Sequence, residues 1–202
     1  MRLRCVWMVL FVFAAGCSGT KVVESWKRPD YEAPRFEKIV VIGLARTPGE
    51  RNAFEKHVVA ELSKRNYQAE RGGTFLPAKP LDVDQDELRE MVVSRGFDGE
   101  VVVALLSGRI SVRAGAGVGA VDQSFGSLYM NYPINFGGAL GASQTQEKIK
   151  YRLVARMYDL SQTGVMWRAE TKTVNPKNRD RFAADFARKV VGRMAADGAL
   201  LR

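Results

Sequence analysis

Residues 38–44 have the sequence KIVVIGL, an uninterrupted apolar run rich in β-branched side chains. Runs of this kind are typical of strands that are buried on both faces of a sheet. Residues 100–106, EVVVALL, repeat the pattern. We therefore expect two central strands in a sheet that is covered by other elements.

Two amphipathic helical patterns lie between these runs. The first carries apolar side chains every four residues, at Phe54, Val58 and Leu62. A short strand is expected near 67–69. The second helix begins at Asp84, an N-cap acid that Glu87 follows at capping-box spacing, and Gly96 ends it.

The C-terminal part predicts a hairpin and a closing helix. In 148–160 apolar residues alternate with basic ones, which indicates a half-buried strand with a basic outer face. Residues 165–174 would pair with it, and a last helix follows from about 178 to Gly198. The basic side chains of the outer face are candidate contacts for a partner: Lys148, Lys150, Arg152 and Arg156.

Together these elements predict one α/β domain over residues 36–202. The element order is β-α-β-α-β-β-β-α, with a mixed five-stranded sheet and three helices. A glycine-rich insertion over 107–146 interrupts it. Three conformations fit this insertion: an extended loop, a hairpin that continues the sheet, or a membrane hairpin that would need an oligomer to close its edges.

The N-terminal residues predict export and lipid attachment. Arg2 and Arg4 precede an uncharged stretch over 5–15 that is too short to span a bilayer and is typical of a signal peptide. Residues 14–17, AAGC, resemble the lipobox of bacterial lipoproteins. That resemblance implies a signal peptide over 1–16, cleavage before Cys17 and acylation of its thiol; Ser18 implies the outer membrane. Residues 17–35 are expected to be a polar tether, with Trp26 packed on the domain.

Composition limits the partners. The chain carries a net charge of +9, and loss of residues 1–16, with two arginines and no acids, leaves +7. In an exported protein this favours anionic surfaces such as lipid headgroups or cell-wall polymers over nucleic acid, and a charge that only keeps the protein in solution is the alternative. With Cys5 removed and Cys17 acylated, no disulfide and no cysteine metal site is expected.

Residues with catalytic potential are few. The single histidine, His57, lies on the first predicted helix without a serine elbow, and is expected to be structural. Alternating acids over 82–86 lack the glycine of a calcium loop and predict a helix cap instead. The glycines of 114–120 lack the lysine of a phosphate loop. We expect no catalytic residue, no metal and no cofactor.

One loop could take a ligand. Arg46 and Arg51 flank the loop after the first buried strand, where ligands dock in open α/β sheets, so a small anion could bind there. Alternatively, Arg51 pairs with Glu55 one helical turn later.

The chain resembles a family of uncharacterised bacterial lipoproteins. The resemblance is carried by Ser25-Trp26, FEKIVVIGL, GFDGEVVVALL and MYDLSQTGVMW. The element order is more distantly similar to the amino-terminal domain of TolB and to the periplasmic domain of the curli-secretion lipoprotein. The resemblance supplies no catalytic residues. It supports the fold and the location and leaves the activity open. From the chain as a whole we expect a non-catalytic, lipid-anchored binding or scaffold protein on the periplasmic face of the outer membrane. The alternative is a subunit of an oligomeric envelope or secretion complex that uses 107–142 for assembly or membrane insertion.

Overall fold

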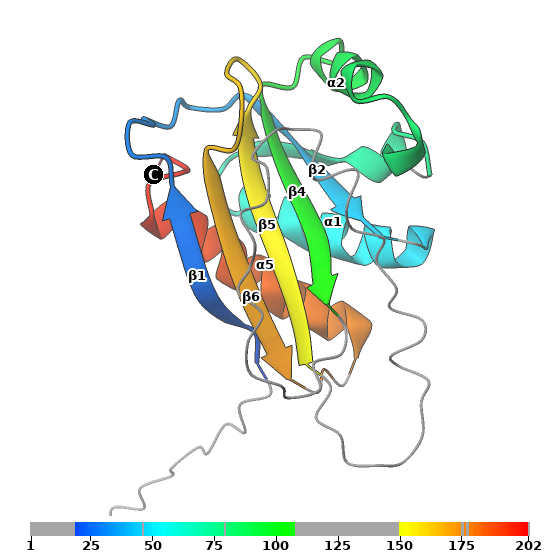
Figure 1. The fold of residues 1–202 in the computed structure, drawn as a ribbon, viewed down its shortest axis with the longest axis vertical. Coiled ribbons are helices and arrows are strands. Elements are labelled where there is room, and N and C mark those ends of the chain that lie inside the picture. The colour runs from blue at the N-terminus through cyan, green and yellow to red at the C-terminus, as the bar shows by residue number, and fades with distance from the viewer. Residues whose placement is uncertain are drawn as a thin grey trace, which may run out of the picture.

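A six-stranded mixed sheet organises the protein in the computed structural model, with strand order β1-β6-β5-β4-β2-β3 (Figure 1). The structure describes residues 19–45, 47–78, 80–107, 150–174, 176 and 178–201. The elements in this part are β1 (Lys21–Lys27), β2 (Lys38–Leu44), α1 (Pro48–Ser63), β3 (Gln68–Arg71), η1 (Gly72–Thr74), η2 (Pro80–Asp82), α2 (Gln85–Val93), β4 (Gly99–Ser107), β5 (Lys150–Asp159), β6 (Trp167–Val174) and α5 (Arg179–Ala196).

The predicted α/β fold is confirmed. Strands β3, β2 and β4 are parallel, whereas β4, β5, β6 and β1 pair antiparallel. Helices α1 and α5 lie side by side across one face of the sheet, and α2 lies at the end where β2 and β4 begin (Figure 1). The apolar run of β2 is buried on both faces, because alternate side chains point to opposite sides of a strand.

Aromatic rings join the two long helices to the sheet. Phe54 of α1 packs edge-on against Phe182 and Phe186 of α5, with ring centroids 5.6 and 5.5 Å apart. The ring centroid of Tyr151, on β5, lies 5.6 Å from that of Phe182. The apolar faces predicted for both helices therefore meet in one core.

The predicted helix ends are also confirmed. The Asp84 carboxylate accepts hydrogen bonds from the backbone N–H groups of Asp86 and Glu87, so the acids of this segment cap α2. Asn66 and Gly96, which follow α1 and α2, have φ angles of 63° and 75°. These left-handed conformations end the helices.

The sheet has six strands instead of five, and the additional strand β1 lies within the segment predicted as a tether. It pairs with β6 at the sheet edge. Only Val22 and Trp26 pack against the core, so polar side chains occupy most of the strand and its apolar signal is weak. Trp26 packs on the domain, as predicted. Tyr31, farther along the predicted tether, is buried as well.

Other predictions fall outside the described residues. They include the signal peptide, Cys17, and residues 108–146 of the insertion. Among the helices that the structure describes, none combines the length and the apolar character needed to cross a bilayer.

Candidate functional site

A cavity of about 480 Å³ lies where the parallel strands β2 and β3 end. Its wall is formed by the first turns of α1 and by the chain that follows β3. The polar side chains of the wall are Arg51, Asn52, Glu55, Arg71 and Thr74. The carboxyl ends of parallel strands are where open α/β sheets bind ligands, and the N-terminus of a helix favours negative charge.

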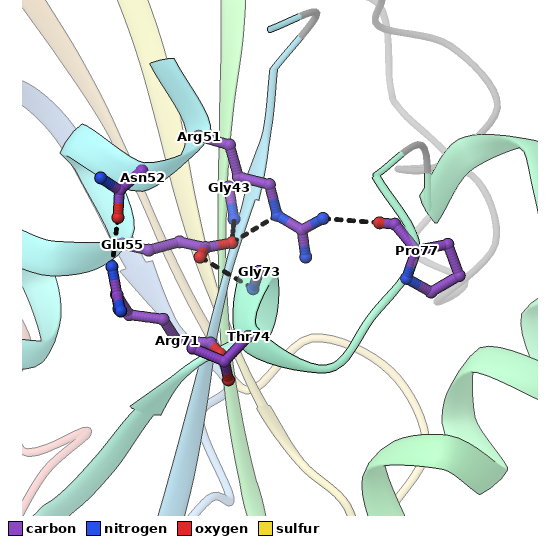
Figure 2. A network of polar contacts seen from close by, with 8 residues as sticks. All are labelled: Gly43, Arg51, Asn52, Glu55, Arg71, Gly73, Thr74 and Pro77. Carbon is purple, nitrogen blue, oxygen red and sulfur yellow. Dashed lines mark hydrogen bonds and ion pairs between the residues drawn. The ribbon is translucent and has the colours of Figure 1, made fainter. Parts of the chain in front are cut away.

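The Glu55 carboxylate is at the centre of a buried polar network (Figure 2). Its Oε1 accepts from the backbone N–H of Gly43, at 3.0 Å, and from Nε of Arg51, at 2.7 Å. Its Oε2 accepts from the backbone N–H of Gly73, at 2.9 Å. One side chain of α1 thus joins the end of β2 to the turn after β3.

Arg51 carries the opposite charge and extends the network to the next loop. Besides the bond to Glu55, its Nη1 donates to the carbonyl oxygen of Pro77 at 2.6 Å. Its Nη2 is buried and has no hydrogen-bond partner among the described residues. Since a guanidinium group can donate five hydrogen bonds, Arg51 keeps donor capacity at the cavity.

Arg71 adds a second guanidinium group to the cavity. Its Nη1 donates to Oδ1 of Asn52, and its backbone carbonyl accepts from the Thr74 hydroxyl at 2.7 Å (Figure 2). Two arginines and one glutamate leave the wall with one net positive charge. Such a wall suits a small anion, because guanidinium groups bind carboxylate and phosphate well.

Of the ligand loop predicted from sequence, Arg51 lies at the cavity and Arg46 is outside the described residues. The alternative prediction, an Arg51–Glu55 pair, is confirmed. Arg71 and Asn52 were missed. They come from separate elements that only the parallel pairing of β2 with β3 brings together, and no spacing in the sequence signals this.

The predicted basic outer face of β5 is wrong in part. Arg156 is only 5% exposed, and Arg152 forms an ion pair with Glu170 of the neighbouring strand β6. The physical reason is position: β5 lies between β4 and β6, so its outer side chains meet neighbours on both sides. Lys148 and the side chain of Lys150 lie outside the described part.

His57 is a link between helices. Its Nε2 lies 2.9 Å from Oδ1 of Asp180, so it joins α1 to the first turn of α5, in agreement with the structural role predicted for it. The hydrogen bond from His57 lowers the pKa of the exposed Asp180 carboxyl. Within the described residues, no group of three or more His, Cys, Asp or Glu side chains is placed to hold a metal ion.

No protein-family model matches the chain, and no curated protein matches it significantly. Solved structures show a distant likeness. PelC from Paraburkholderia phytofirmans, solved as a dodecamer, is 14% identical, with 85% of this chain and 94% of that chain covered and a TM-score of 0.48. A PelC variant in another crystal form is 13% identical, with 83% of this chain and 96% of that chain covered and a TM-score of 0.46. A Xanthomonas campestris protein of the family DUF330 is 10% identical, with 85% of this chain and 90% of that chain covered and a TM-score of 0.41. These values are too low to transfer an activity, a ligand or an assembly to this chain.

Proposed function

We propose that this chain is a non-catalytic, lipid-anchored binding or scaffold protein of the bacterial cell envelope. Cys17 would hold it on the periplasmic face of the outer membrane. The observation that carries the proposal is how soon the fold begins after this cysteine. Thr20 is buried: its backbone N–H donates to Oδ2 of Asp185 at 2.6 Å, and its hydroxyl lies 2.8 Å from that of Thr173.

Thr20, which makes the first tertiary hydrogen bond among the described residues, is the third residue after Cys17. Fully extended, the chain from Cys17 to Thr20 spans about 10 Å. Acyl chains on Cys17 would therefore keep the domain directly at the membrane surface. Two or more such chains give stable anchoring, at roughly 0.8 kcal/mol per buried methylene.

The cavity favours binding over catalysis. Both oxygens of Glu55 already accept hydrogen bonds from groups that hold the fold together. The two guanidinium groups beside it are suited to holding an anion.

The proposal is tested by replacing each cysteine of the full chain in turn. Cys17→Ala should abolish incorporation of a labelled fatty acid and move the protein out of the membrane fraction. Cys5→Ala is the matched control, because Cys5 would leave with the signal peptide, and it should change neither property. Equal labelling or equal membrane association of both variants would overturn the proposal.

A further inference from the structure

The edge of the sheet where β1 begins carries two lysines in direct opposition. Lys21 of β1 and Lys172 of β6 are register partners on an antiparallel pair. Both side chains are exposed. Like charges directly opposite each other destabilise a sheet.

The acids on the same face of these strands are already engaged. Arg152 forms an ion pair with Glu170, and Arg168 lies 3.6 Å from Glu24. Within the described residues, neither Lys21 nor Lys172 forms an ion pair. As far as the described residues go, this end of the sheet therefore keeps two uncompensated positive charges. We name Lys21 and Lys172 the basic edge.

We propose that the basic edge rests on the anionic headgroups of the membrane that holds Cys17. Sites where local charge rules are broken are commonly functional, since a partner compensates for the conflict. The placement fits this partner. Lys21 is the fourth residue after Cys17, which gives a reach of at most about 14 Å. The attraction of a membrane for lysine and arginine decays over a Debye length, about 8 Å at physiological salt, so it acts only on charges that a short tether keeps near the surface.

This inference rests on the lipid anchor of the proposed function. Its test uses the mature lipoprotein reconstituted in vesicles that contain phosphatidylglycerol and a lipid with a nitroxide in its headgroup. Val23→Cys, on β1 near the basic edge, carries a fluorophore in one sample. Glu32→Cys, in the connection beyond the far end of β1, carries it in the other. Both positions are exposed.

The fluorophore at position 23 should be quenched more strongly than the one at position 32, and neutral phosphatidylcholine vesicles should reduce this contrast. Lys21→Gln with Lys172→Gln should also reduce it in anionic vesicles, while protein stability holds or rises because the lysine conflict is relieved. Arg35→Gln with Arg95→Gln is the matched control. It also removes two exposed charges, but these lie shortly before the starts of β2 and β4, at the end of the sheet away from the basic edge. It should leave the contrast unchanged.

Equal quenching at the two positions, or a contrast that depends neither on anionic lipid nor on the two lysines, would overturn the inference. Failure of lipid attachment at Cys17 would give a different result. A protein without lipid on Cys17 would not float with the vesicles, whereas a wrong orientation would be measured on protein that does.

Discussion

Nε of Arg51 lies 2.7 Å from Oε1 of Glu55, and both side chains are almost completely buried. Exposed pairs at this spacing contribute a few tenths of a kcal/mol. Here the carboxylate also accepts two backbone N–H groups, and the guanidinium group binds the carbonyl of Pro77. The pair therefore connects β2, α1 and the two loops that line the cavity.

Removing the carboxylate should strongly destabilise the protein. Glu55→Ala leaves Arg51 buried without its counter-charge, which costs about 3–5 kcal/mol for buried pairs. Urea denaturation followed by circular dichroism measures the loss.

Glu61→Ala is the matched control on the same helix. Glu61 pairs with Arg65 at the same spacing but nearer to solvent, and should cost about 1 kcal/mol or less. Similar losses for the two variants would contradict the structural role given to Glu55.

The cavity should bind a small anion. Inorganic sulfate or phosphate should raise the melting temperature, by a stabilisation of about 1.4 kcal/mol at ten times its dissociation constant. Arg71→Gln removes one guanidinium group from the cavity wall and should weaken the effect. Lys64→Gln, on the exposed surface of α1's C-terminal end, should retain it. An anion effect of the same size in both variants would place binding elsewhere.

Two glycine substitutions should shift stability in opposite directions. A Cβ on Gly43 would lie 3.2 Å from the backbone oxygen of Arg51, so Gly43→Ala must push α1 away from β2 and should cost about 1–3 kcal/mol. Gly192 lies inside α5, where an added Cβ would meet only an ordinary contact at 3.8 Å. Gly192→Ala should stabilise by about 0.5–1 kcal/mol. Thermal denaturation of both variants checks the pair, and a stabilising Gly43→Ala would show that the approach of α1 to β2 is looser than described.

Acid should destabilise the fold partly through Asp197. Burial raises the pKa of this carboxyl, but hydrogen bonds, above all the one from Nε1 of Trp167, and the ion pair with Arg193 lower it below its ordinary value of 3.8. A depressed pKa contributes stability above the unfolded value, and this contribution is lost as pH falls through the folded value. Urea unfolding at about pH 7 and about pH 3, followed by tryptophan fluorescence, should therefore show a smaller difference for Asp197→Asn than for the unchanged chain. An unchanged difference would assign the acid sensitivity to other carboxyl groups.

The central strands and the helices were predictable because their signals are local. The apolar run of β2, the four-residue repeat of α1 and the cap at Asp84 each depend on residues close in sequence. Strand β1 was missed because it lies at an edge, where packing requires only Val22 and Trp26 to be apolar. Edge strands with polar side chains lack the pattern of a buried strand.

The candidate site was only half predictable for a related reason. Arg51 and Glu55 lie one turn apart on one helix, so their pairing could be read from spacing. Arg71 and the Gly73 amide reach the same place through the pairing of β3 with β2. The burial of Arg156 likewise follows from the position of β5 inside the sheet, which the strand's own alternation does not reveal.

The intact mass of the protein purified from bacterial membranes tests the central claim most directly. The account predicts a chain that begins at Cys17 and carries acyl groups, with no species that contains residues 1–16. A chain that keeps residues 1–16, or one with a free Cys17 thiol, would contradict it.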